Sequence, residues 1–199
     1  MSQSGPSQRI AILFSGRGSN LKSLAAHIAR QDVPAELICA ISNRPQAGGL
    51  AFCAEANIAT QVIDHKTFQD RSAFDAALDT ALHAARIDLV CCAGFMRLLT
   101  PEFVTKWQGR LLNIHPSLLP AYKGLHTHAR ALEDGALEHG CSVHYMRPEM
   151  DNGPLIVQKT VPVLADDSVE TLAARVLVQE HIAYGEALDI VLKKMADTA

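Results

Sequence analysis

Apolar and polar positions along the first half of this chain follow a pattern that predicts strands followed by helices. Four short, mainly apolar runs are typical of buried parallel strands, and they cover residues 9–14, 36–41, 60–63 and 88–93. Between these runs, apolar residues recur at helical spacing over residues 21–30, 49–56 and 71–85. This succession predicts β-α-β units, and therefore a Rossmann-like open, mainly parallel twisted sheet with helices on both faces.

The second half of the chain is less regular and ends in an antiparallel strand pair and a long helix. A short helix over residues 101–107 precedes a strand at 110–114, a loop at 117–125 and a helix at 126–134. Residues 141–146 and 155–163 alternate like two antiparallel strands, and residues 168–194 have the spacing of a closing helix with Ser168 as its N-cap. Because no linker or repeat separates these elements, we expect one domain over residues 1–199, with residues 1–8 flexible.

Composition narrows the classes of function. A chain of 199 residues with 48% hydrophobic and 20% charged residues is ordinary for a globular domain. Its net charge of -3 and the lack of a lysine or arginine run disfavour nucleic-acid binding, which needs clustered cations. The five cysteines are odd in number and form no C-x-x-C pair, and no window predicts a signal peptide or a membrane span. We therefore expect a cytoplasmic protein that binds neither nucleic acid nor membrane.

A glycine-bearing loop follows the first predicted strand and leads into the first predicted helix. Gly16 and Gly18 let the backbone approach a ligand closely, and the amides at the start of the helix can hold an anion. A dinucleotide site would need a third glycine where Leu21 stands and an acidic residue after the second strand, where the chain has Ser-Asn. The loop therefore predicts a site for a single phosphate monoester, with Ser19 and Asn20 adding donors. The simpler alternative is a tight turn that caps a helix.

The most informative stretch is Asn113-Ile-His115-Pro116, at the end of an apolar run. If residues 110–114 form a strand, alternation puts the side chains of Asn113 and His115 on the same face, and Pro116 ends the strand there. Ligands bind at the carboxyl edge of open α/β sheets, and a neutral donor beside a titratable one suits an acyl-transfer oxyanion. Asp151 is a candidate to orient the imidazole and favour its charged form. A structural histidine before a proline is the alternative on composition alone.

Other candidate chemistry has weaker support. His126 and His128 could ligate a metal together with His139 or His144, but these residues lack the spacing of a zinc site. Ser117 lacks the G-x-S-x-G elbow of a serine nucleophile, and the cysteines in apolar runs lie too deep for a reactive thiolate. We therefore expect no metal and no covalent nucleophile.

Together these residues resemble the phosphoribosylglycinamide formyltransferase family, the folate-dependent enzymes of purine biosynthesis. The resemblance covers nearly the whole chain and rests on residues 15–20, 93–98, 111–120, 124–128, 142–144, 151–154 and 179–181. An N-x-H-P segment with a later D-x-G-P would indicate only the wider formyltransferase superfamily. The glycine loop and the Gly-Leu-His-Thr-His segment narrow the resemblance from that superfamily to this family. The resemblance implies transfer of a formyl group from 10-formyltetrahydrofolate, as co-substrate, to the glycyl amine of glycinamide ribonucleotide.

The resemblance also implies which residues form each part of the site. The ribotide-binding matches are Gly18, Ser19, Asn20 and Glu180. The folate-binding matches are Arg71, Met96, Arg97, Leu98, Leu99, Asn113, Arg147, Pro148, Glu149 and Met150. The catalytic trio is Asn113, His115 and Asp151, in which Asn113 and a protonated His115 stabilise the oxyanion and Asp151 keeps His115 protonated. The expected association state is a monomer or a homodimer.

Two related enzymes share this catalytic pattern. A formyltetrahydrofolate hydrolase is the nearest alternative, although that family carries an N-terminal regulatory domain and differs in the segment after the active-site histidine. A transfer-RNA formyltransferase would bring a C-terminal domain and a basic surface. A noncatalytic mononucleotide-binding module is an alternative of another class, and the intact set of Asn113, His115 and Asp151 argues against it.

Overall fold

One seven-stranded sheet organises the protein, whose computed structural model describes residues 7–198. The strands are β1 (Gln8–Phe14), β2 (Ala35–Ser42), β3 (Thr60–Val62), β4 (Leu89–Cys92), β5 (Leu111–His115), β6 (Glu138–Tyr145) and β7 (Leu155–Pro162). Their order in the sheet is β3-β2-β1-β4-β5-β6-β7, with β1 to β5 parallel and β6 and β7 antiparallel to their neighbours. The predicted fold class, an open, mainly parallel sheet that ends in an antiparallel pair, is confirmed.

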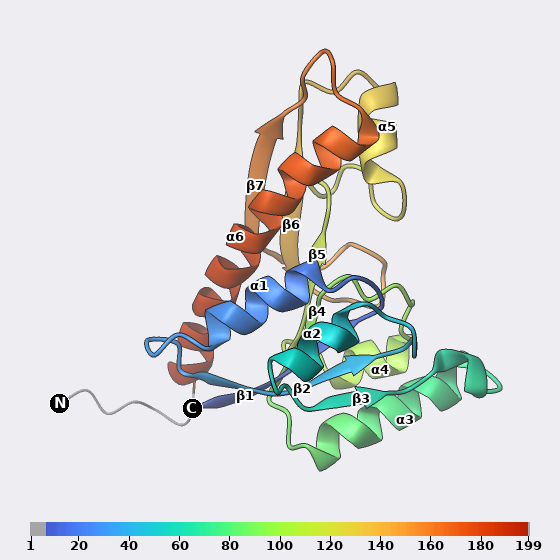
Figure 1. Cartoon of the computed structure of the whole chain (residues 1–199), viewed down its shortest axis with the longest axis vertical. Coiled ribbons are helices and arrows are strands. Elements are labelled where there is room, and N and C mark those ends of the chain that lie inside the picture. Colours follow the sequence, from blue (N-terminus) through green and yellow to red (C-terminus); the bar gives the residue numbers. More distant parts are fainter. Residues whose placement is uncertain (1–6, 199) are drawn as a thin grey trace.

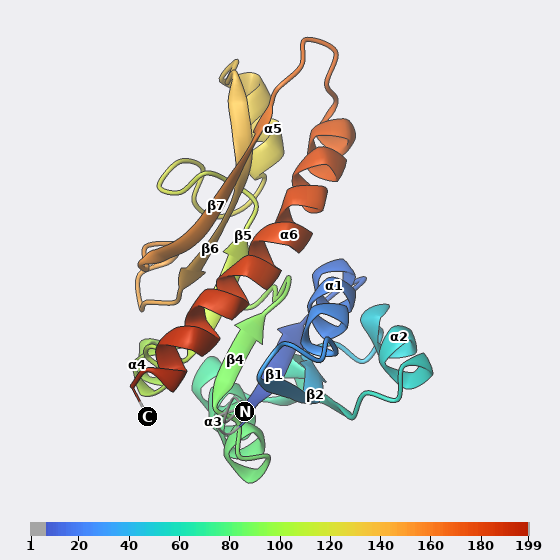
Figure 2. The ribbon, with the colours of Figure 1, turned by 90° about the vertical axis from the view of Figure 1, so that its left-hand side faces the viewer.

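Helices cover both faces of the sheet (Figures 1 and 2). They are α1 (Ser19–Ile28), α2 (Gly49–Glu55), α3 (Arg71–Ala84), α4 (Pro101–Lys106), α5 (Thr127–Glu133) and α6 (Val169–Ala196), with a short 3-10 turn, η1, at His65–Thr67. Helices α1, α2 and α6 pack into one buried apolar cluster, and α3 and α4 pack into another on the opposite face. Figure 2 shows α6 running diagonally beside β6 and β7. The central strands β1, β4 and β5 are therefore buried on both faces, as their apolar sequences predicted, whereas the edge strands β3 and β7 are largely exposed.

Alternate side chains along β1 pack into the two apolar clusters on opposite faces of the sheet. Ile10, Ile12 and Phe14 belong to the α1/α6 cluster, whereas Ala11 and Leu13 belong to the α3/α4 cluster, and all five are fully buried. Strand β2 lies beside β1 on one side, and β4 lies beside β1 on the other. From β1 the chain therefore builds the sheet first toward β3 and then, from β4, in the opposite direction. In open α/β sheets the crevice outside the carboxyl ends of such strands is the usual ligand site.

Two boundaries differ from the prediction. Strand β6 begins at Glu138, three residues before the predicted start, because residues 138–140 pair with the end of β7. The sequence Glu-His-Gly has low strand propensity, but Gly140 suits this pairing, since an added Cβ would lie 2.0 Å from the carbonyl oxygen of Lys159. Of residues 1–8, which were expected to be flexible, Gln8 is the first residue of β1 and residues 1–6 lie outside the described residues.

The closing helix begins as predicted and runs slightly further. Its N-cap is Ser168, whose hydroxyl accepts a hydrogen bond from the Thr171 amide. The Ser168 amide in turn donates a hydrogen bond to the Thr171 hydroxyl. This reciprocal capping box satisfies amides that the helix itself leaves without partners. In the middle of the helix, the buried Tyr184 hydroxyl donates to the carbonyl oxygen of Cys92 at 3.0 Å and so ties α6 to the end of β4.

Candidate active site

The carboxyl end of β5 presents Asn113 and His115 on one face, and the β6–β7 loop brings Asp151 to them. Nδ1 of His115 lies 3.5 Å from Oδ2 of Asp151, and both side chains are about nine-tenths buried. The Asp151 backbone is left-handed, with φ of 49°, and its Oδ2 also accepts a hydrogen bond from the Gly124 amide at 2.9 Å. The three residues proposed as a catalytic trio are therefore neighbours, although Asp151 is distant from the other two in the sequence.

A second loop fixes the far side of the His115 ring. Nε2 of His115 lies 3.0 Å from the backbone carbonyl oxygen of Tyr122. A carbonyl oxygen only accepts, so Nε2 carries the proton in this contact. Because Nδ1 faces a carboxylate, the ring can donate to both neighbours only as an imidazolium. Lys123 donates to Oδ1 of Asn152 at 2.6 Å and links this loop to the one that carries Asp151.

His144 is a site residue that the sequence analysis considered only as a metal ligand. It stands opposite Asn113 in the β5–β6 register and is almost completely buried. Its Nδ1 lies 2.9 Å from the Tyr145 carbonyl oxygen and its Nε2 lies 3.3 Å from Nδ2 of Asn113. Burial lowers the pKa of His144 despite the nearby Asp151 carboxylate, which favours the neutral ring. A neutral ring that donates from Nδ1 accepts at Nε2, so His144 can orient the Asn113 amide.

The glycine loop and α6 meet on the α1 side of the site. Gly18 has a φ of 78° and precedes α1, and a Cβ at this position would lie 2.9 Å from Cα of Gly49. Asn20, in the first turn of α1, donates from Nδ2 to Oε2 of Glu180 at 2.6 Å. Burial raises the pKa of Glu180, although the bond from Asn20 and the charge of His115 oppose that shift. The four residues expected to contact the ribotide therefore lie together, since Gly18, Ser19 and Asn20 are consecutive and Asn20 contacts Glu180.

A cavity of about 660 Å³ adjoins this loop. Ser15 and Gly16 line it on one side, and the turn after β2 and the start of η1 line it on the other. Arg17, Arg44 and Lys66 contribute cationic side chains to its walls. Asp64 adds one carboxylate, so cationic side chains outnumber acidic ones in the lining of this cavity.

The segment after β4 exposes apolar side chains at the same edge. Met96 and Leu98 are 58% and 49% exposed, and Met150, on the Asp151 loop, is 56% exposed, whereas Leu99 is buried in the α3/α4 cluster. The Arg97 guanidinium lies over the Phe74 ring at 4.9 Å, and its Nε is buried with no partner among the described residues. Exposed apolar surface beside an unsatisfied donor is suited to a flat ligand with polar edges.

The remaining residues expected at the folate site are dispersed. Arg71 is the exposed first residue of α3, and Pro148 and Glu149 are exposed on the Asp151 loop. The Arg147 side chain lies elsewhere, in a cavity between that loop and α6.

The alternative chemistries find little support. Oγ of Ser117 is engaged with the Ala121 carbonyl oxygen at 2.6 Å, and burial raises the pKa of the Cys91 thiol to about 12. His139 and His128 contact each other at 3.1 Å, but residues 7–198 contain no group of three metal-ligating side chains in position to hold an ion. Within the same residues, no helix has the length and apolar character needed to cross a membrane.

The strand order reverses between β1 and β4, and Asn113, His115 and Asp151 lie together at the carboxyl end of the next strand, β5. The chain belongs to the formyl transferase family, whose model matches residues 8–188. The family expected from the sequence motifs is thereby confirmed.

Particular relatives narrow the position within the family. Phosphoribosylglycinamide formyltransferase of Escherichia coli (strain K12) is 46% identical over 175 residues, which are 88% of this chain and 82% of that protein. The crystal structure of phosphoribosylglycinamide formyltransferase from Brucella melitensis superposes with a TM-score of 0.89 at 45% identity, covering 93% of this chain and 95% of that one. Trifunctional purine biosynthetic protein adenosine-3 of Drosophila melanogaster is 46% identical over 191 residues, and the chain spans 14% of its length.

Proposed function

We propose that this chain transfers the formyl group of 10-formyltetrahydrofolate to the amine of N1-(5-phosphoribosyl)glycinamide. The products are formylglycinamide ribonucleotide and tetrahydrofolate, in de novo purine biosynthesis. The observation that carries the proposal is the convergence of Asn113, His115 and Asp151 at the sheet edge. The names and coverage of the E. coli and Brucella relatives support the same reaction.

The ribotide binds on the glycine-loop side of the trio. Amides at the start of α1, after Gly18, point toward the carboxyl edge and favour a phosphate there. Ser19 adds a hydroxyl, and the Asn20–Glu180 pair adds an amide oxygen and a carboxylate for sugar hydroxyl or amine donors. The neighbouring Arg17, Arg44 and Lys66 raise the local concentration of the anionic substrate.

The formyl folate binds on the other side, between the segment after β4 and the Asp151 loop. Met96, Leu98 and Met150 offer apolar surface to its ring system. The unsatisfied Nε of Arg97 is a donor for a polar edge of that ring. This arrangement brings the formyl carbon between Asn113 and the ribotide amine.

The reaction is a direct transfer. The neutral amine attacks the formyl carbon, the bond from that carbon to N10 of the folate breaks, and the amine proton passes to N10. Asn113, held by His144, donates to the oxygen that becomes an oxyanion. His115 donates to the same oxygen after Nε2 exchanges the Tyr122 carbonyl for the substrate, while Asp151 holds Nδ1. No metal and no covalent enzyme intermediate takes part in these steps.

We further propose that the protein works in the cytoplasm as a single catalytic domain. All named side chains come from one chain, so a monomer or a homodimer suffices. The cysteines at 39, 53, 91, 92 and 141 are free thiols, as expected for the cytoplasm. Residues 1–199 act as a single catalytic domain on two small molecules, without nucleic acid or membrane.

Steady-state kinetics of His115→Ala and Asp151→Asn test the roles. We expect turnover to fall by about 100- to 1000-fold in each, while the dissociation constant of the ribotide changes little, because these groups act in the transition state. Asp166→Asn, the same substitution at an exposed position, is the control and keeps the parent's turnover. Near-parental turnover in both site variants would refute the assignment.

The reaction itself is tested by supplying 10-formyltetrahydrofolate with and without the ribotide. We expect tetrahydrofolate to form only when the ribotide is present, with one formylated ribotide for each folate released. Equal folate release in both samples would identify a formyltetrahydrofolate hydrolase instead.

A further inference from the structure

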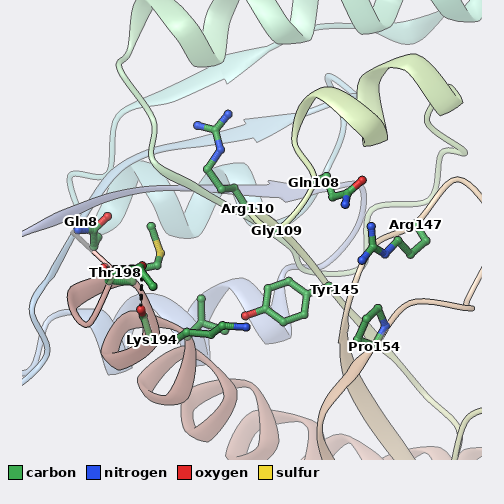
Figure 3. A pocket seen from close by; sticks show the side chains of 11 residues that line it. Gln8, Gln108, Gly109, Arg110, Tyr145, Arg147, Pro154, Lys194 and Thr198 are labelled. Atoms are coloured by element: carbon green, nitrogen blue, oxygen red, sulfur yellow. Dashed lines mark hydrogen bonds between the residues drawn. The ribbon is translucent and has the colours of Figure 1, made fainter.

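Another cavity, of about 640 Å³, lies at the opposite edge of the sheet from the glycine loop. The last turns of α6 form one wall, and the start of β1, the turn before β5 and both ends of the Asp151 loop form the others (Figure 3). Its size is within the range of small-molecule sites. The proposed reaction does not use this cavity, because Asn113 and His115 lie at the other end of β5.

Cations predominate among the described residues that line the cavity. Arg110, Arg147 and Lys194 line it, and none of its eleven lining residues is acidic. Within the described part of the chain, these three side chains form no ion pair and no hydrogen bond. In a protein of net charge -3, such a group of uncompensated cations in one hollow favours an anionic ligand.

Aromatic rings hold two of these cations in place. The Lys194 ammonium lies 5.8 Å from the centre of the Tyr145 ring, and the Arg110 guanidinium lies 4.7 Å from the centre of the Trp107 ring. Figure 3 shows Lys194 and Arg147 on either side of Tyr145, whereas the Arg110 guanidinium is directed away from both. The Tyr145 ring therefore favours a position of the Lys194 ammonium beside the cavity.

The cavity also has an apolar part. Beside the cations, it is lined by Val191 and Met195 of α6 and by Pro154 of the β6–β7 loop. A suitable ligand therefore combines two or three negative charges with a ring or other weakly polar body. We infer that the cavity binds a nucleoside diphosphate, with its phosphates at Arg147 and Lys194 and its base or sugar against the apolar wall.

The cavity is joined to the catalytic site through the Asp151 loop. The Tyr145 amide donates to the Pro154 carbonyl oxygen at 3.0 Å and closes the base of the loop. Gly153 makes this closure feasible, because a Cβ there would lie 1.6 Å from the Tyr145 carbonyl oxygen. Arg147 is on the cavity side of the loop and Asp151 on the catalytic side, so a ligand on Arg147 restrains the segment that carries Asp151.

Calorimetric titration of the full chain with ADP tests the site. We expect saturable binding that weakens by about ten-fold or more in Arg147→Gln and in Lys194→Gln, since each loses a charge-assisted contact. Lys193→Gln, an exposed neighbour on the same helix, is the matched control and binds like the parent. Trp107 is the only tryptophan, so its emission should also change on binding.

Three outcomes would overturn the inference. The first is no saturable binding of ADP. The second is binding that Gly18→Ala abolishes and Arg147→Gln leaves intact, which would assign ADP to the phosphate loop. The third is pyrophosphate binding as tightly as ADP, which would remove the nucleoside from the site. Unfolding curves of the variants, expected to match the parent, verify that the folds are intact.

Hydrogen exchange tests the link to the loop without relying on the proposed reaction. ADP should slow the exchange of amides in residues 145–153 of the parent and not of Arg147→Gln. Unchanged exchange in the ADP-bound parent would refute the coupling.

Discussion

Protonation of the buried His139 should destabilise the protein in mild acid. The ring is 1% exposed, contacts His128 at 3.1 Å and lies edge-on to Tyr122. Burial, together with the charges of His128 and His115, lowers the pKa of His139 from 6.5 to about 4. Between these two pH values the unfolded chain binds a proton that the folded chain does not, so stability is complete above pH 6.5 and falls as the pH falls toward 4.

The two pKa values set the size of the effect. For a single site, the linkage relation gives a loss of about 2 kcal/mol in the free energy of unfolding between pH 7 and pH 5. Urea unfolding of the parent and of His139→Gln at both pH values isolates this contribution. The variant should be less stable at pH 7, because it loses packing, but its loss between the two pH values should be smaller by about 2 kcal/mol.

A direct titration makes the reasoning refutable. If His139→Gln does not fold, the NMR titration of the His139 ring in the parent serves instead, with an expected midpoint near pH 4. A midpoint above pH 6, or equal pH dependence in parent and variant, would refute the argument.

Three further substitutions probe the glycine loop, the segment after β4 and the closing helix. Gly18→Ala forces a left-handed alanine against Gly49, so urea unfolding should show a loss of roughly 1–2 kcal/mol and kinetics a higher KM for the ribotide. Asp75→Ala removes the acceptor of the Thr100 amide (2.6 Å), which should cost about 1–3 kcal/mol and raise the KM for folate more than that for the ribotide. Ser168→Ala removes a helix cap, with an expected loss of about 1 kcal/mol and an unchanged kcat.

Local patterns were sufficient to predict most of the fold. Helix and strand periodicities located the elements because each periodicity depends only on residues that are a few positions apart in the sequence. The helix cap at Ser168 was equally local. The start of β6 was not predicted, because its pairing depends on the partner strand and on Gly140 fitting against Lys159. Strand pairing depends on residues that are distant in the sequence, so the intrinsic strand propensity of residues 138–140 did not indicate that they belong to β6.

The sequence by itself determined the alternation that puts Asn113 and His115 on one face of a strand, and the glycine loop that precedes a helix. Only the tertiary structure decided which residues contact Asn113 and His115. The β5–β6 register sets His144 against Asn113, and the path of the β6–β7 loop brings Asp151 to His115 and turns Arg147 toward α6. Backbone alternation is fixed within a few residues, whereas these contacts depend on how distant segments pack around a common core.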